Sequence, residues 1–272
     1  MTAAALAGGL VRLPAPPRAA ATAPQPTVRW AERVVAYSPG ISPAQPFTQP
    51  ELALGALDSA AAPGRGSFHV VSIGPGGSLV LGFDGPIVNH PEMPDLIVFG
   101  NAFYSNGVTR AHFQEPGLVE VAVDTNENGV ADAAEPFYLL RGGMVPDPGW
   151  PPAFPLPPQY SGAVDHDLHP TRGYCDVTPS DAAGSPSLPD DPQLHGISVG
   201  SAGGDAFDLD WAVDTSGQPL GLERVHFIRI RCAMAAVPNT YAPGTASTEV
   251  DAVAVLPPPG PPAEPACRWE LR

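Results

Sequence analysis

The sequence predicts an all-β protein, a single jelly-roll-like β-sandwich with long proline-rich loops. Short apolar runs at residues 69–74, 77–83 and 95–99 are separated by turn-forming residues, which is typical of the strands of a sandwich. The 37 prolines and 29 glycines indicate many turns, whereas a hydrophobic content of 43% is normal for a packed core. A chain of 272 residues is long enough for one large domain of this kind.

The remaining elements follow from local patterns. Residues 34–37 are expected to form a strand and residues 52–55 a short turn of helix. Pro75 and Gly76 join two consecutive strands, and 95–99 is a buried strand. Further strands are expected at 119–123, 137–140, 207–211, 225–231 and 250–256.

The sandwich domain is expected to span residues 29–256. Residues 1–28, rich in alanine and proline, are expected to be a disordered leader or the remnant of a signal segment. Prolines exclude a sheet interior at 146–158, so residues 144–194 are interpreted as a long loop excursion, and 257–272 as a proline-rich tail. No apolar run is long enough to predict a transmembrane segment.

The charge of the chain excludes several functional classes. The net charge is −15, and all 13 basic residues are arginine. A strongly acidic chain is not expected to bind nucleic acid. Without lysine there is no P-loop lysine, Schiff-base lysine or kinase-type lysine.

The three cysteines, Cys175, Cys232 and Cys267, lie far apart and form no C-x-x-C pair. This spacing excludes a zinc ribbon and a thioredoxin motif. One disulfide and one odd thiol is the simplest arrangement, and Cys175 with Cys232 is one plausible pair if the protein is exported. All three pairings remain open at this point.

Residues 124–135 predict a calcium site, because oxygen-bearing residues occupy positions 1, 3, 5, 9 and 12 of a twelve-residue loop. Gly129 stands at position 6, where an EF-hand loop needs a positive φ. The flanking runs have strand patterns, which indicates an EF-hand-like loop between two strands. The simpler alternative is an acidic hairpin turn at Asn128-Gly129. The expected ligands are Asp124, Asn126, Asn128, the carbonyl of Val130, Asp132 and Glu135.

A second calcium site is a further hypothesis. Alternation of Phe207, Leu209 and Trp211 would turn Asp208 and Asp210 to the opposite face of a strand. These carboxylates could share an ion with Asp95 and Asp251 at neighbouring strand ends. The alternative is that they face solvent on an edge.

Gly196-Ile197-Ser198-Val199-Gly200 matches the nucleophile elbow of α/β-hydrolases, with later aspartates and His226 in the corresponding order. The elbow requires a strand, a tight turn and a helix, whereas residues 201–205 are poor helix formers. A chance match is therefore favoured over a hydrolase based on Ser198.

Two groups in the excursion have chemical potential. Trp150, Phe154 and Tyr160 could stack on a sugar or pin the loop to the sandwich, and pinning is favoured. His166 and His169 with their aspartate neighbours could bind a metal, but Pro170 argues against a helix that would bring them together.

Several segments together resemble a family of bacterial exported proteins called "cell surface protein". They are 34–40, 53–55, 71–83, 94–99, 204–209 and 250–255, so the resemblance spans about residues 33–256, which is most of the chain. It implies a jelly-roll β-sandwich similar to galactose-binding and carbohydrate-binding modules.

The favoured function is a calcium-stabilised, exported, non-catalytic module for binding or adhesion at a cell surface, with a glycan or a protein as partner. One alternative is a hydrolase that uses Ser198 or paired carboxylates in a cleft. The other is a structural component of a surface layer or fibre.

Overall fold

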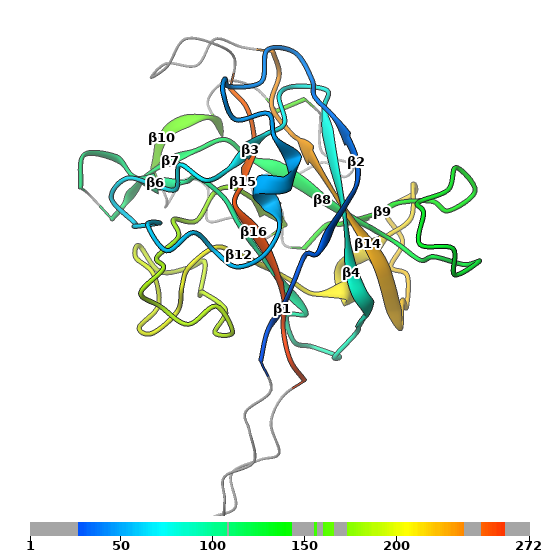
Figure 1. Cartoon of the computed structure of the whole chain (residues 1–272). Coiled ribbons are helices and arrows are strands. Elements are labelled where there is room, and N and C mark those ends of the chain that lie inside the picture. The colour runs from blue at the N-terminus through cyan, green and yellow to red at the C-terminus, as the bar shows by residue number, and fades with distance from the viewer. Residues whose placement is uncertain are drawn as a thin grey trace, which may run out of the picture.

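The structure is a computed structural model that describes residues 27–107, 109–142, 155–156, 160–165, 173–236 and 246–258. The chain is all-β, with several antiparallel sheets, as a β-sandwich requires (Figure 1). None of the helices in these ranges is both long and apolar enough to cross a membrane. The predicted all-β class is confirmed.

Sixteen strands and three 3₁₀ helices are defined in these ranges. The strands are β1 (Arg29–Trp30), β2 (Arg33–Ser38), β3 (Val71–Ser72), β4 (Ser78–Val88), β5 (Leu96–Phe99), β6 (Phe103–Tyr104), β7 (Ala111–Gln114), β8 (Gly117–Ala122), β9 (Tyr138–Leu140), β10 (Gly162–Asp165), β11 (Tyr174–Cys175), β12 (Asp205–Phe207), β13 (Ala212–Val213), β14 (Arg224–Cys232), β15 (Glu249–Val250) and β16 (Ala252–Val255). The 3₁₀ helices are η1 (Pro50–Ala53), η2 (Ser105–Gly107) and η5 (Leu209–Trp211).

The largest sheet has the order β13-β9-β8-β14-β4-β2, with β11 also pairing with β8. A second sheet has the order β1-β16-β5-β12. Two smaller sheets are β10-β7-β6 and β15-β3. The main core contains side chains from the two larger sheets, including Leu81 of β4, Ile230 of β14, Val98 of β5 and Val253 of β16. These two sheets therefore pack face to face, as the sandwich prediction requires.

Strand β5 is apolar on both faces because it is covered on both faces. Leu96 and Val98 belong to the main core, whereas Ile97 and Phe99 pack in a second cluster with Trp30. All four residues of the strand are fully buried. This explains why 95–99 shows a continuous apolar run instead of alternation.

The outer face of the largest sheet carries its own small apolar cluster. Phe227, Val80 and Ala122 form it, and Ala131 and Phe137 pack against it. Beside this cluster Arg229 and Arg231 both form ion pairs with Glu120, the cross-strand neighbour of Arg229. The 124–135 loop therefore packs against the outer face of the sheet through Ala131, and Phe137, which follows the loop, packs there too.

Several local predictions can be compared with the structure. The expected helical turn near 52–55 is present as η1. The strands around Pro75-Gly76 are present, but β3 pairs with β15 while β4 pairs with β2 and β14. The expectation of one extended strand at 207–211 is wrong. The strand ends at Phe207, and the Asp208 side chain accepts a hydrogen bond from Asp210 N and caps η5.

The 144–194 excursion contains two strands, β10 and β11. Its described part also returns to the core, since Tyr174, Cys175 and Val177 are buried in it. Tyr160 packs against the same core, in the manner of a loop anchor. Trp150, Phe154, His166 and His169 lie outside the described residues, as do the expected leader at 1–26 and most of the tail.

Cys175 and Cys232 are both buried free thiols. They flank Gly117 on opposite sides of β8. Two strand spacings place their Cα atoms roughly 10 Å apart, beyond the reach of a disulfide. The pairing of these two cysteines is therefore not formed, and Cys267 lies outside the described residues.

Candidate functional site

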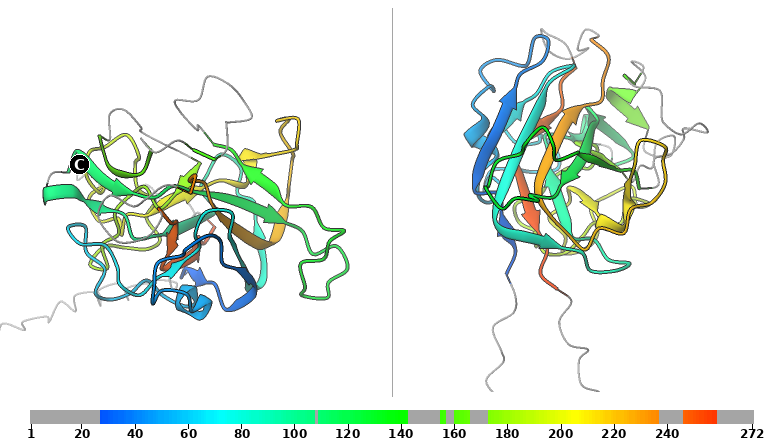
Figure 2. Two further views of the ribbon diagram at one scale, coloured as in Figure 1. Left: turned by 90° about the horizontal axis from the view of Figure 1, so that it is seen from above. Right: turned by 90° about the vertical axis from the view of Figure 1, so that its right-hand side faces the viewer.

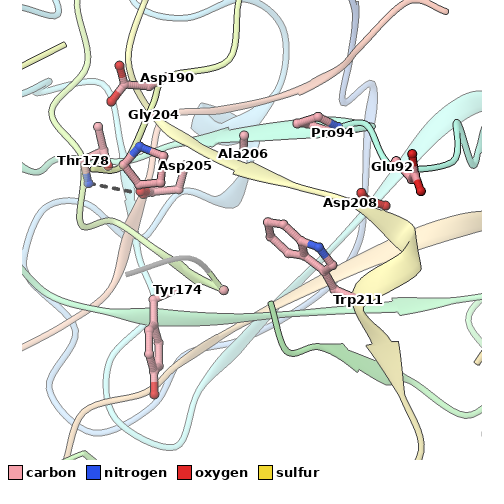
Figure 3. Close-up of a pocket in the computed structure, with 12 residues that line it drawn as sticks. Glu92, Pro94, Tyr174, Thr178, Asp190, Gly204, Asp205, Ala206, Asp208 and Trp211 are labelled. Atoms are coloured by element: carbon pink, nitrogen blue, oxygen red, sulfur yellow. Dashed lines mark hydrogen bonds between the residues drawn. The ribbon is translucent and has the colours of Figure 1, made fainter. Parts of the chain in front are cut away.

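A cleft of about 450 Å³ opens where β12 and η5 meet the chain around Tyr174. Four carboxylate residues line it, together with the two aromatic residues Trp211 and Tyr174 (Figure 3). The carboxylates belong to Glu92, Asp190, Asp205 and Asp208. The indole of Trp211 lies between the Asp205 end and the Asp208 end of the cleft (Figure 3).

The turn from β12 into η5 presents three of these side chains. Phe207 is fully buried, whereas Asp205 and Asp208 line the cleft. The cap at Asp208 starts η5 and brings Trp211 back beside Phe207, with 6.2 Å between ring centroids. The sequence from Asp205 to Trp211 therefore places two carboxylates and one indole around one opening.

Asp205 is held rigidly at one end of the cleft. Its Oδ2 accepts hydrogen bonds from Val177 N at 3.1 Å and Thr178 N at 3.4 Å. Burial nevertheless raises the pKa of Asp205 to about 7, because desolvation outweighs these bonds. Burial likewise raises the pKa of Asp208 to about 6. Two carboxyl groups of the cleft are thus able to change protonation near neutral pH.

The Gly196-x-Ser198-x-Gly200 motif lies in a loop near the rim of this cleft. Ser198 N donates to Asp190 Oδ1 at 2.6 Å, and Ser198 Oγ accepts from Asp191 N at 2.9 Å. No helix follows the motif, since residues 201–204 lead into β12. His226, the histidine expected to complete a triad, instead accepts a hydrogen bond from Asp124 N at 3.1 Å. The arrangement of an α/β-hydrolase elbow is therefore missing around Ser198.

The residues of the predicted second calcium site are divided between two places. Asp95 lies beside η5, where its Oδ2 accepts from Leu209 N at 2.9 Å and its Oδ1 accepts from His90 N at 2.8 Å. Asp210 accepts from Asn89 Nδ2 and Glu92 N. Asp251 precedes β16 and Asp95 precedes β5, and these strands are antiparallel. Asp251 therefore lies at the opposite end of the strand pair from Asp95, Asp208 and Asp210.

The 124–135 loop connects β8 and β9, which pair through Val121 and Tyr138. The loop projects beyond these two strands (Figure 2). The predicted position of the loop between two strands is thus confirmed. Gly129 has a φ of 75°, which confirms the expected positive φ at position 6. The loop is an insertion into a hairpin and has no helix at either end.

The predicted ligand side chains converge within this loop. Asn126 Nδ2 and Asn128 Nδ2 donate to Asp132 Oδ2 at 2.8 Å and 2.9 Å. Asp124 accepts from Asn128 N and Gly129 N. Val130, whose carbonyl was the expected ligand at position 7, donates its N–H to Asn128 Oδ1 at 2.7 Å. The groups at positions 1, 3, 5 and 9 therefore share one small volume.

Glu135, at position 12, closes the loop. Its Oε1 accepts from Thr125 N and Thr125 Oγ1, and its Oε2 accepts from Asp132 N. The bond from the Asp132 backbone is the main reason why the pKa of Glu135 lies below its ordinary value. Glu135 is thus kept ionised, as a cation ligand must be.

Two residues from other strands fix the loop. Asp124 N donates to His226 Nδ1 on β14, and Arg33 on β2 donates to the Gly129 carbonyl at 2.7 Å. The Arg33 guanidinium also lies 5.8 Å from the ring centroid of Phe227. Neither contact was predicted, because both partners are far from the loop in sequence.

The types and order of the ligand residues in the loop suit a calcium ion, but the side-chain amides of two of them direct nitrogen and not oxygen toward the other ligands. Within the described residues, no three His, Cys, Asp or Glu side chains are gathered so as to hold a metal ion. Asn126 and Asn128 turn their NH₂ groups toward Asp132, so each amide would have to rotate to offer its oxygen. Hard oxygen ligands of this kind suit Ca²⁺.

A second acidic group was missed by sequence reasoning. Glu115, Asp176 and Glu249 are buried in the interior and are called here the interior acidic cluster. Asp176 accepts from the backbone N–H of Asn101, Ala102 and Glu249, at 2.7 to 2.9 Å. Burial is the main cause that raises the pKa of each of the three carboxyls. The signal was weak because these residues are far apart in the sequence.

A comparison of the chain with models of known protein families and with curated proteins finds no match. The candidate sites described above are therefore interpreted from their own geometry.

Proposed function

We propose that this chain is a calcium-stabilised, exported β-sandwich that binds a glycan non-catalytically in the cleft beside Trp211. The observation that carries the proposal is the position of the Trp211 indole between carboxylates in a cleft of about 450 Å³. The resemblance to exported cell-surface proteins supports the same location and class of partner. Adhesion at a cell surface is the expected biological role.

The chemistry of the cleft suits a polyhydroxylated ligand. An indole face is apolar and can pack on the C–H face of a sugar ring. The carboxylates are hydrogen-bond acceptors for sugar hydroxyl groups. The net charge of −15 disfavours a ligand with phosphate, sulfate or uronate groups. The proposed ligand class is therefore a neutral or amino-bearing glycan.

Calcium has a structural role in this proposal. Asp124, Asn126, Asn128, Asp132 and Glu135 would hold the ion at the β8–β9 hairpin, with the Val130 carbonyl. The ion would supply positive charge between the carboxylates and thereby order the loop. The loop is attached to the sheet by Arg33 and His226, so ordering it stabilises that edge of the fold.

Hydrolysis of the bound glycan is a second candidate, favoured by the raised pKa values of Asp205 and Asp208. Protonated Asp205 would give its proton to the leaving glycosidic oxygen. Ionised Asp208 would take a proton from the water that attacks the anomeric carbon, so that one C–O bond forms as the other breaks. The paired carboxylates, and not Ser198, would be the catalytic groups.

Glycan binding is tested with an array followed by calorimetry on the best ligand. We expect Trp211→Ala to weaken binding at least tenfold and Trp211→Phe to weaken it less, because Phe keeps an aromatic face. Phe68→Ala is the matched control, since Phe68 is 70% exposed and does not line the cleft. Thermal unfolding of each variant checks that loss of the Phe207 contact has not unfolded the protein. Failure of the wild type to bind any glycan would overturn the proposal.

The hydrolytic candidate is separated in the same experiment. Bound glycan is incubated with the protein and analysed for new reducing ends. Release that is lost in both Asp205→Asn and Asp208→Asn would establish hydrolysis, whereas binding without release supports the non-catalytic module.

A further inference from the structure

One buried carboxylate oxygen in this fold is left without a donor. Asp251 lies between β15 and β16 and is fully buried. Its Oδ1 accepts a hydrogen bond from Asp58 N at 3.0 Å. Its Oδ2 is buried and accepts no hydrogen bond from any residue that the structure describes. An unsatisfied carboxylate oxygen in the interior is costly, which indicates that a further partner belongs there.

Two more oxygen groups lie around this carboxylate. Asp58 is half-buried. Burial is the main cause that raises the pKa of Asp251, and the charge of Asp58 raises it further. Ser67 Oγ is 3.5 Å from Asp58 Oδ2. A hydrogen-bonding interaction with the Ser67 hydroxyl lowers the pKa of Asp251, although no donor is in hydrogen-bonding geometry with its Oδ2 within the described residues. Asp58, Ser67 and Asp251 therefore direct oxygen atoms toward one another.

A second unsatisfied acceptor lies next to this group. Asn101 Oδ1 is buried and has no hydrogen-bond partner within the described chain. It packs on Gly66, the neighbour of Ser67, so closely that a Cβ on Gly66 would come within 2.3 Å of it. The Asn101 amide nitrogen is already used, since it donates to Glu249 Oε2 at 2.7 Å. Two buried acceptor atoms, Asp251 Oδ2 and Asn101 Oδ1, therefore lie near the 58–67 segment without a donor in the described residues.

The charges around Asp251 favour a cation. Asp58 and Asp251 together carry two negative charges when ionised, and neither forms an ion pair in the described residues. His69 lies near enough to lower the pKa of Asp251, but its ring is exposed. Oxygen-only ligands and two carboxylates are the donor set that Ca²⁺ prefers, with water completing the shell. Asp58 is half-buried and therefore keeps contact with solvent.

We propose that Asp58, Ser67 and Asp251 form a divalent cation site of the calcium type, distinct from the 124–135 loop. The ion fastens the 58–67 segment to the start of β16, which is 193 residues away from Asp58 in the sequence. The site involves Asp251 but not Asp95, Asp208 or Asp210. It does not depend on glycan binding or on the loop.

The test counts calcium ions by calorimetry and native mass spectrometry on the full chain, after EDTA treatment and at pH 8. We expect two ions in the wild type, and one ion each in Asp251→Asn and Glu135→Gln, with none in the double variant. Asp214→Asn is the matched control, because Asp214 caps only its own turn at residues 216 and 218. It should keep both ions.

The two sites can fail separately. One ion in the wild type that is lost in Glu135→Gln but kept in Asp251→Asn would overturn this proposal and leave the loop intact. One ion that is lost only in Asp251→Asn would support this proposal and remove calcium from the loop. If Asp251→Asn does not fold, Ser67→Ala is used in the Glu135→Gln background. At least a fivefold weaker affinity is expected there, and an unchanged affinity would count against the site.

Discussion

The 124–135 loop and the interior acidic cluster both gather carboxylates, but they satisfy them in opposite ways. In the loop, Asp124 accepts from N–H groups only four and five residues away. In the cluster, Asp176 accepts from Asn101 N and Glu249 N, 75 and 73 residues away, and Glu115 accepts from Ser247 N, 132 residues away. The loop carboxylates organise one turn, whereas the cluster carboxylates join distant segments of the sandwich.

The two regions also differ in electrostatics. Hydrogen bonds, led by the Asp132 N–H, lower the pKa of Glu135 in the loop. Desolvation raises the pKa of Glu115, Asp176 and Glu249 in the interior, and the negative neighbours raise it further for Glu115 and Asp176. The lowered pKa of Glu135 favours the ionised carboxylate, which can bind a cation. The raised pKa values in the interior acidic cluster favour the protonated carboxyl groups.

Removing one carboxylate from each region should give very different losses of stability. Asp176→Ala leaves three backbone N–H groups in the interior without an acceptor, so we expect it to cost about 5 kcal/mol of unfolding free energy. Asp132→Ala removes an exposed network and should cost about 0.5 kcal/mol in the absence of calcium. Urea unfolding measures both. Equal losses would show that the interior bonds are not the stronger ones.

The same contrast explains how much could be predicted from the sequence. The loop, its flanking strands and the positive φ of Gly129 were predictable because every feature depends on residues 119–140. The interior cluster was not, because Glu115, Asp176 and Glu249 meet only after β8, β11 and β15 are in place. Asp176 has a positive φ of 59°, but no pattern in the sequence around it predicted this conformation.

The candidate cleft was predictable only in part. Asp208, Asp210 and Trp211 were singled out, but alternation assigned them to a strand, and the cap at Asp208 changes the chain direction before Trp211. Asp205 was covered only by the 204–209 segment of the family resemblance and by the aspartates that follow Ser198. Its position beside Val177 and Thr178 depends on contacts with a segment 27 and 28 residues away. The alternating pattern predicted a strand at 207–211, but the cap at Asp208 ends the strand there. The position of Asp205 depends on contacts that are distant in the sequence.

Asp205, a buried carboxyl of the cleft that lies next to the interior acidic cluster, should make the protein less stable as pH rises. The folded pKa of Asp205, which accepts from Val177 beside Asp176, is about 7, above its ordinary value of 3.8. A raised folded pKa means that its stabilising contribution is complete below about pH 4 and is lost as pH rises through 7. Between pH 5 and pH 8 we expect a loss on the order of 3 kcal/mol, measured by urea unfolding.

Asp205→Asn is the control for this pH dependence. Asn cannot ionise, so the slope between pH 5 and pH 8 should become shallower. Glu135 has the opposite sign, since its lowered pKa makes its contribution fall only as pH drops below its ordinary value. A stability that increased from pH 5 to pH 8 would contradict the raised pKa of Asp205.

Calcium bound in the 124–135 loop should add to the stability of the folded protein. With 10 mM Ca²⁺ and a dissociation constant of about 10⁻⁴ to 10⁻³ M for the loop, mass action predicts roughly 1.4 to 2.7 kcal/mol of stabilisation. Chelation with EGTA should remove it, as measured by the shift in Tm. Asp124→Ala and Glu135→Ala should each weaken loop binding at least tenfold by calorimetry. Wild-type affinity in either variant would remove that residue from the ligand set.

The smallest expected effect concerns Arg33, which connects the loop to the rest of the fold. Its bond to the Gly129 carbonyl and its position over Phe227 hold the loop against the outer face of the sheet. Arg33→Met keeps the apolar stem but loses the donor, and we expect it to cost about 0.5 to 1 kcal/mol without calcium. Because Arg33 positions the loop and is not a ligand, calcium affinity should fall by less than threefold. If Arg33→Met weakened calcium binding as much as Asp124→Ala, the loop would need its contact with β2 to bring the ligands together. The calcium site would then depend on long-range contacts as well as on residues 124–135.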